Sequence, residues 1–271
     1  MRVLLINDTS NYHNGCKQVV RTIHKWLKPH TVVHSLPVAV PHIMFDTWDD
    51  VDVVVCNGEG TMHNNRQGAT SLLNFLHKAQ QQNKPTLLIN SIWQNMDSHW
   101  HSVTDNLVYW SVRDELSQMH AEGVHSRKPE LCADYSWFEE VQSEPADKHD
   151  ITLGQSFDRK QTLINHPQRI DIFSQSWSAC VNQLRNSELL VSGRFHEVMS
   201  SIRAGTPFLA IEGNSWKMEA LISSAKSDLP VLKQFPNDIR NANIFKIYKS
   251  EYQKIFNWHK QQTLPNIHTI L

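Results

Sequence analysis

One short segment constrains the fold of this chain more than any other: Ser192–Glu197, which carries Arg194 and His196 between two apolar runs. Leu189–Val191 precedes it, and Phe208–Ile211 follows it. This order predicts a strand, a turn, a helix and a second, parallel strand. In parallel α/β sheets, ligands bind at the carboxyl edge of the strands, and a helix N-terminus at that edge attracts anions. The segment therefore predicts an anion site built on Arg194 and His196.

Short β-branched runs alternate with helical patterns along the rest of the chain, which is typical of βαβ units. The first series has predicted strands at Val3–Ile6, Thr31–Val33, Val51–Val55, Thr86–Ile89, Leu107–Val112 and Glu130–Ala133, and predicted helices at Cys16–Leu27 and Ser71–Ala79. The second has predicted strands at Ile151–Leu153, Leu189–Val191 and Phe208–Ile211, and predicted helices at Ser174–Leu184, His196–Ala204 and Trp216–Ser223. We therefore expect an α/β protein with parallel sheets.

A polar, proline-containing segment, residues 142–150, separates the two series and predicts a linker. We expect a Rossmann-like first domain over residues 1–141 and a second Rossmann-like domain over residues 151–240, facing each other across a cleft. Residues 241–271 are expected to form a helical tail, because apolar side chains recur at helical spacing between residues 242 and 259. This tail is expected to pack back on the first domain.

The composition limits the partners that the chain can bind. Its 271 residues carry a net charge of −1, so no nucleic-acid surface is predicted. Four widely spaced cysteines favour reduced, buried thiols. No run is long enough to span a membrane, and the first residues indicate a strand rather than a signal peptide. We expect a cytoplasmic protein, in peripheral contact at most with the inner face of a membrane and a lipid-linked acceptor.

Polar side chains follow the first two central strands. Asp8, His13 and Asn14 come after the first strand, and they suit either helix capping or contact with an acceptor substrate. Glu59 lies after the next central strand, flanked by Gly58 and Gly60, which would let the backbone approach a ligand. Glu59 is therefore a candidate general base, with a tight turn carrying a solvated glutamate as the alternative.

Charged residues mark two further strand ends. Arg113 stands where a helix would begin, so its guanidinium and the helix amides could share an anion. The alternative is a surface pair in which Asp114 caps the helix. Asp134 is a similar strand-end carboxylate. For Arg194 and His196 the alternative is a buried ion pair and a core histidine.

Other groupings carry no predicted chemistry. His99 and His101 alternate but lack a third ligand at metal-site spacing, so no metal site is predicted. Asp50-Val51-Asp52 begins a strand rather than ending one, which favours a turn. The chain has no Walker phosphate loop, no dinucleotide-binding glycine fingerprint after the first strand and no nucleophile elbow. Common nucleotide hydrolases, dehydrogenases and serine hydrolases are therefore disfavoured.

The strand ends carry an ordered set of motifs, and the set is more specific than any member of it. These are Val53–Gly60, Val112-Arg113-Asp114-Glu115-Leu116-Ser117, Cys132-Ala133-Asp134, Gly193-Arg194-Phe195-His196 with Gly205-Thr206-Pro207, and Lys217 after Ile211-Glu212-Gly213. Together, over about residues 1–220, they resemble the polysaccharide pyruvyl transferase family.

The resemblance implies a GT-B-like fold and transfer of a pyruvyl group from phosphoenolpyruvate to sugar hydroxyls of a cell-surface polysaccharide or its precursor, without a cofactor. It implies that Arg113, Arg194 and His196 hold the donor's carboxylate and phosphate. It extends the donor site to Ser117, Lys217, Gly58 and Gly60, and leaves Asp8, His13 and Asn14 for the acceptor. His196 is the expected acid, and Glu59 or Asp134 the expected base.

The chain departs from the family pattern at two turns. The first turn has Cys16 where an acid is usual, and the second has Glu59 where a third glycine is common. Two alternatives therefore stay open. One is a glycosyltransferase with a nucleotide-sugar donor, for example a galactofuranosyl transferase, in which Arg194 and His196 bind the diphosphate. The other is a non-catalytic carbohydrate-binding or assembly protein.

Overall fold

The structure is a computed structural model, and it describes residues 1–37, 45–123, 125–144, 148–155, 167–236 and 247–271. Contacts divide the chain into two compact units. Unit 1 comprises Met1–Asn11, Val19–Tyr135 and Thr263–Leu271, and unit 2 comprises Tyr12–Gln18 and Ser136–Gln262. The expected linker at residues 142–150 lies inside unit 2, and its residues 145–147 fall outside the described part of the chain.

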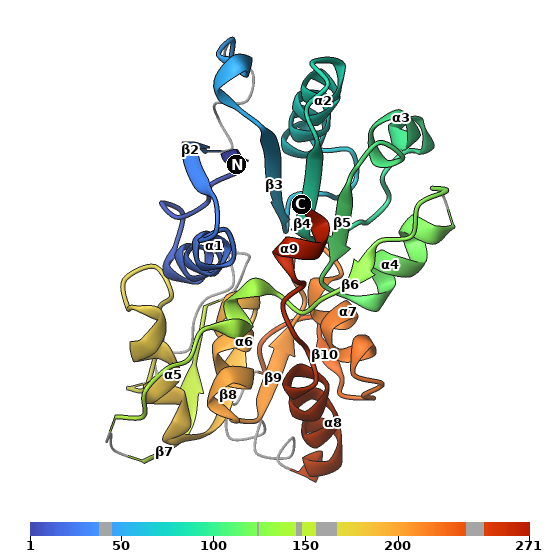
Figure 1. The fold of residues 1–271 in the computed structure, drawn as a ribbon. Helices are drawn as coiled ribbons and strands as arrows, with labels where there is room; N and C mark the ends of the chain where they lie inside the picture. The colour runs from blue at the N-terminus through green and yellow to red at the C-terminus, as the bar shows by residue number, and fades with distance from the viewer. Residues whose placement is uncertain (38–44, 124, 145–147, 156–166, 237–246) are drawn as a thin grey trace. The chain divides into compact units, whose positions relative to one another are not determined.

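Unit 1 contains a parallel sheet of six strands in the order β2-β1-β3-β4-β5-β6 (Figure 1). The strands are β1 (Arg2–Ile6), β2 (Thr31–Leu36), β3 (Val53–Glu59), β4 (Thr86–Ser91), β5 (Tyr109–Val112) and β6 (Glu130–Leu131). Its helices are α2 (Gln67–Gln81), α3 (His101–Thr104), α4 (Glu115–Glu122) and α9 (Ile267–Ile270). Helix α1 (Asn14–Trp26) begins among the residues of unit 2 and continues in unit 1.

The residues of β3 and β4 explain why these strands lie at the centre of the sheet. Every residue of both strands is buried, as expected for parallel strands covered on both faces. Strand β1 pairs with β2 on one side and with β3 on the other, so the strand order reverses between β1 and β3. Such a switch point leaves a crevice at the carboxyl ends of the strands, where ligands bind in open α/β sheets.

Unit 2 contains a parallel sheet of four strands in the order β10-β9-β8-β7. These are β7 (His149–Leu153), β8 (Ser187–Ser192), β9 (Phe208–Ile211) and β10 (Val231–Leu232), and the helices are α5 (Trp177–Arg185), α6 (Phe195–Ala204), α7 (Lys217–Ser224) and α8 (Lys249–Lys260). Three short 3-10 turns complete the described elements of the chain, at Trp48–Asp50, Ser98–Trp100 and Tyr135–Phe138. The parallel sheets and all nine strands expected from the sequence are present, and β10 was not anticipated.

The two C-terminal helices belong to different units. The last helix, α9, groups with unit 1, where the Trp26 indole donates to the Pro265 carbonyl at 2.7 Å. Helix α8, which the periodicity of residues 242–259 predicts, instead belongs to unit 2. Its Tyr252 and Ile255 are buried in the core of that unit, and the Tyr252 hydroxyl donates to the Phe208 carbonyl at 2.8 Å. The prediction that the C-terminal tail packs on the first unit is therefore correct for α9 and wrong for α8.

Two further expectations concern the thiols and the membrane. All four cysteines are free and buried, as predicted. Within the described ranges, no helix has the length and apolar character needed to cross a bilayer.

Candidate functional site

In unit 1, asparagine side chains join the carboxyl ends of β1, β3 and β4. The Asn7 amide donates to the Asn57 carbonyl, and the Asn57 amide donates back to the Asn7 carbonyl at 3.3 Å. The Asn90 amide donates to the Asn57 side-chain oxygen at 3.3 Å and accepts from the Tyr135 backbone N–H at 3.0 Å. Asn7 and Asn90 have φ values of 60° and 54°, a left-handed conformation that asparagine tolerates. These residues fix the sheet edge at the switch point.

Glu59 also has a left-handed backbone, with φ 44°, but glutamate tolerates this conformation less well than asparagine or glycine. Its side chain is 5% exposed. Gly58 is required by packing, because a Cβ there would lie 2.3 Å from the Ser91 Cβ, whereas a Cβ on Gly60 would meet the Arg113 guanidinium at an ordinary 3.6 Å. Backbone strain of this kind is typical of functional sites.

Arg113 lies beside this turn and is held by a buried ion pair. Its Nη1 donates to the Asp134 carboxylate at 2.7 Å, and the two side chains are 3% and 1% exposed. Asp134 is thus engaged by Arg113, which suits it to fixing the guanidinium. Glu59, the other predicted base, is buried in the same unit.

Asp114 and Ser117 have local roles at the start of α4. The Asp114 carboxylate caps the helix by accepting from the Ser117 N–H at 2.7 Å. The capping alternative for Asp114 is therefore correct, although Arg113 pairs with Asp134 rather than with Asp114. The Ser117 hydroxyl is buried and accepts from the Trp93 N–H at 2.8 Å, which ties α4 to the chain after β4. This contact gives Ser117 a structural role.

The three residues predicted on the acceptor side are divided between the two units. Asp8 belongs to unit 1. Burial raises the pKa of its carboxyl, but hydrogen bonds from Ser10 and Ser35 outweigh burial, so the pKa is lowered overall. His13 and Asn14 belong to unit 2. There the Asn14 amide donates to the Gln175 carbonyl at 2.8 Å and fastens the start of α1.

In unit 2, the turn between β8 and α6 is organised by a buried carboxylate, Glu197. It accepts from the Ser192 hydroxyl at 2.6 Å and from the Gln155 N–H at 2.8 Å. The Ser192 oxygen accepts in turn from the Arg194 N–H at 2.9 Å. A Cβ on Gly154 would lie 2.1 Å from the Glu197 carboxylate, so only glycine fits there. The network sets the backbone that presents Arg194 and His196.

His13 lies within electrostatic range of Arg194, Lys217 and His196 in unit 2. Burial, followed by the charges of His196, Arg194 and Lys217, lowers the pKa of His13 to about 3. His13 is therefore neutral at pH 7 in a strongly electropositive setting. The Arg194 guanidinium lies 5.1 Å from the centre of the Phe173 ring, and the Lys217 ammonium donates to the Asn214 side chain at 3.0 Å. We call Arg194, His196, Lys217 and His13 the Arg194 group.

The first turn of α1 packs directly on His196. A Cβ on Gly15 would lie 2.4 Å from the His196 Cβ, so glycine is needed for this approach. The His13 and His196 rings meet edge to face with centroids 5.0 Å apart. His13 precedes α1 and caps it, because its Nδ1 accepts from the Cys16 N–H at 3.1 Å.

The structure brings Cys16 into this group, which sequence reasoning did not anticipate. The metal-ligating atoms of His13, Cys16 and His196 all lie within 4.8 Å of one another. The His13–Cys16 spacing of three residues at a helix start was a usable signal, because residues i and i+3 share a helix face. No spacing rule links either residue to His196, which lies far along the chain.

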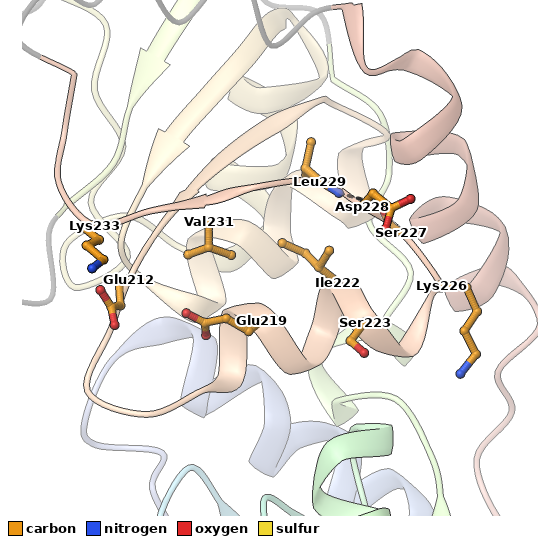
Figure 2. A pocket seen from close by; sticks show the side chains of 10 residues that line it. All are labelled: Glu212, Glu219, Ile222, Ser223, Lys226, Ser227, Asp228, Leu229, Val231 and Lys233. Atoms are coloured by element: carbon orange, nitrogen blue, oxygen red, sulfur yellow. Dashed lines mark hydrogen bonds between the residues drawn. The ribbon is translucent and has the colours of Figure 1, made fainter.

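A pocket of about 640 Å³ lies elsewhere in unit 2, between α7 and the segment that leads into β10 (Figure 2). Its charged lining residues are Glu212, Glu219, Lys226, Asp228 and Lys233. Burial and the nearby Glu212 charge raise the pKa of Glu219. None of the predicted site residues lines this pocket. Its three carboxylates do not favour a small polyanion, in contrast to the Arg194 group.

A family model described as polysaccharide pyruvyl transferase matches residues 3–215. No curated protein matches the chain in sequence.

Solved structures with a similar fold include S. aureus MnaA with UDP, at 10% identity and a TM-score of 0.57, covering 94% of this chain and 90% of that one. UDP-GlcNAc 2-epimerase from Neisseria meningitidis bound to UDP-GlcNAc is 12% identical, with a TM-score of 0.52 and coverage of 98% and 95%. The spinosyn rhamnosyltransferase SpnG is 11% identical, with a TM-score of 0.51 and coverage of 99% of each chain. The fold is GT-B-like, as predicted.

Gly15→Ala is expected to destabilise the protein by about 1–3 kcal/mol, because the added methyl group overlaps His196. Denaturant unfolding measures the loss. Gly123→Ala is the matched control, since a Cβ there meets its nearest atom at an ordinary 3.5 Å. Equal stability of the two variants would contradict the close packing of α1 on His196.

Glu197 is expected to make stability depend on pH. Burial raises the pKa of its carboxyl from 4.5 to about 7, so the folded state holds a proton that the unfolded state releases. Its contribution to stability is complete below about pH 4.5 and is lost as pH rises through about 7. Glu197→Gln should flatten this decline in chemical denaturation measured from pH 5 to 8. The exposed control Glu144→Gln should keep the wild-type slope, and a decline unchanged in Glu197→Gln would refute the assignment.

Proposed function

Because the chain belongs to the polysaccharide pyruvyl transferase family, we propose that its donor is phosphoenolpyruvate and that its acceptor is a hydroxyl-bearing sugar of a polysaccharide or its precursor. The enzyme is a transferase with a GT-B-like fold. The single observation that carries the donor proposal is that Arg194 and Lys217 act electrostatically on His13, whose ring packs against that of His196 in unit 2.

The Arg194 group suits a small, densely charged anion. Arginine binds carboxylate and phosphate through two parallel hydrogen bonds, and lysine adds a mobile point charge. The N-terminus of α6, where Arg194 is the capping residue, adds the positive end of a helix dipole. Phosphoenolpyruvate carries a carboxylate and a phosphate on three carbons, so it matches both the charge and the size of such a site.

The reaction requires a proton at the enol carbon of the donor. Protonation of the methylene carbon produces a methyl group and a cationic carbon that a sugar hydroxyl attacks. Loss of phosphate and attack by a second hydroxyl, whose proton passes to the departing phosphate, then complete a cyclic ketal. His196 is the proposed proton donor, because it belongs to the cationic group and its backbone is fixed by the Ser192–Glu197 network.

Glu59 is the proposed base that takes the proton from the attacking hydroxyl. Its side chain is buried on a strained backbone, which is typical of a functional position, and the ion pair of Asp134 with Arg113 suits that carboxylate to holding the guanidinium. Arg113, held by Asp134, is proposed as a further donor-binding residue. We place the reaction in the cytoplasm, in the synthesis of an exopolysaccharide, capsule or lipopolysaccharide.

A nucleotide-sugar donor is the second candidate, favoured by the fold neighbours that are bound to UDP and UDP-GlcNAc. A glycosyl transfer would use the Arg194 group for the diphosphate. The same ligand-binding experiment separates the two donors.

Phosphoenolpyruvate at 100 times its dissociation constant should stabilise the protein by about 2.7 kcal/mol, measured as a thermal shift. Arg194→Ala should lose most of this shift, because the bidentate contact is gone, while Arg169→Ala, an exposed arginine of the same unit, should keep it. A shift produced by a UDP- or CMP-sugar and not by phosphoenolpyruvate would reject the proposed donor.

Glu59→Gln and Glu59→Gly should both lower kcat by at least about 100-fold, because general base catalysis is lost. Glu59→Gly should also raise the free energy of unfolding by about 1 kcal/mol, since glycine accepts the φ of 44° without strain. Asn83→Gly, at an exposed position with φ 55°, is the control for backbone effects and should retain activity. Full activity of Glu59→Gln would show that Glu59 is not the general base.

A further inference from the structure

We propose that His13, Cys16 and His196 form a binding site for one zinc-like divalent cation. Their ligand atoms, two imidazole nitrogens and one thiol sulfur, all lie within 4.8 Å of one another. The site goes beyond the proposed transfer reaction, which uses His196 but gives no role to Cys16.

The distances are close to those of a tetrahedral zinc centre. With Zn–S and Zn–N bonds of about 2.3 and 2.0 Å, the sulfur and nitrogen corners of a tetrahedron are about 3.5 Å apart. In the structure, the Cys16 Sγ and the His13 Nε2 are 3.4 Å apart. The third ligand comes from the His196 ring, which meets the His13 ring edge to face at 5.0 Å.

Two helix starts hold the three ligands. His13 caps α1, Cys16 lies in the first turn of that helix, and His196 is the second residue of α6. Gly15, between the first two ligands, permits the approach of His196, because any Cβ there would overlap it. Cys16 and His196 are 4% and 6% exposed, so a bound ion would be shielded from bulk water.

The ligand set selects the type of ion. Thiolate and imidazole ligands favour zinc and similar ions over magnesium or calcium, which prefer oxygen. A coordinating thiol loses its proton, so Cys16 would bring one negative charge into the site. Arg194 lies in the same unit near His13, and its positive charge opposes a cation. Affinity should therefore depend strongly on the thiolate.

Binding changes one hydrogen bond of the free protein. The His13 Nδ1 now accepts from the Cys16 N–H, which leaves the proton of the neutral ring on Nε2, facing Sγ. Ligation through Nε2 moves that proton to Nδ1 and gives up the cap. Three protein ligands leave a fourth position open to water or an anion, as in catalytic rather than structural zinc sites. While His196 is a ligand it cannot donate a proton, so metal binding and the proposed acid role exclude each other.

Cobalt titration of chelator-stripped protein tests the site, because tetrahedral cobalt–thiolate centres have characteristic visible and near-ultraviolet absorption. We expect one equivalent of Co²⁺ to bind with a thiolate charge-transfer band, and Zn²⁺ to displace it. Cys16→Ala should abolish the band and weaken Zn²⁺ binding at least tenfold. Cys180→Ala, which removes another buried free thiol of unit 2, is the matched control and should bind as the wild type does.

Absence of the band in the wild type, or its survival in Cys16→Ala, would overturn the site. If Cys16→Ala does not fold, His13→Asn serves instead, since asparagine can still cap α1 but removes a ligand. The cobalt spectrum does not depend on the donor or on turnover, so it tests the metal site even if the proposed function is wrong. The mutual exclusion of metal binding and the acid role of His196 rests on the proposed function. Equal transfer rates for zinc-saturated and stripped protein would refute this exclusion.

Discussion

The position of the Arg194 group depends on one buried carboxylate, Glu197. A carboxylate without exposure to water is costly unless donors surround it, and here the Ser192 hydroxyl and the Gln155 N–H supply them. Because Ser192 also accepts from the Arg194 N–H, the same network fixes the backbone that carries the cations. The sheet edge, the turn and the helix start therefore form one hydrogen-bonded assembly. Gly154 is needed there because a Cβ at that position would overlap the Glu197 carboxylate.

The two units use different side chains to join the carboxyl ends of their strands. In unit 1 the carboxyl ends of the central strands are joined by asparagine amides, which act as neutral donors and acceptors at left-handed backbone positions. In unit 2 the equivalent edge is joined by Glu197, a group whose pKa lies near neutrality. The asparagine amides do not ionise, whereas the unit 2 edge is expected to lose stability as Glu197 ionises.

Sequence reasoning succeeded where the signal is local. Alternating apolar runs predicted the strands, and the segment from Ser192 to Glu197 predicted a strand end with Arg194 and His196 at a helix start. It failed where contacts join distant segments. Asp134 was recognised as a strand-end carboxylate, but its pairing with Arg113 depends on the register of β5 and β6. The periodicity of α8 gave the helix and not its packing partner, since a 3.6-residue repeat says only that one face is buried.

The two departures from the family pattern have physical consequences of opposite kinds. At Glu59 a glycine would accept the φ of 44° without strain, and the proposed catalytic role of the carboxylate would offset the conformational cost of the glutamate. At Cys16 the usual acid would place a permanent negative charge beside Arg194 and His196. A thiol places none until a metal or a base removes its proton. With a neutral thiol at Cys16, the Arg194 group stays electropositive when no metal is bound. In the proposed site, binding of a zinc-like cation would change the charge of the group.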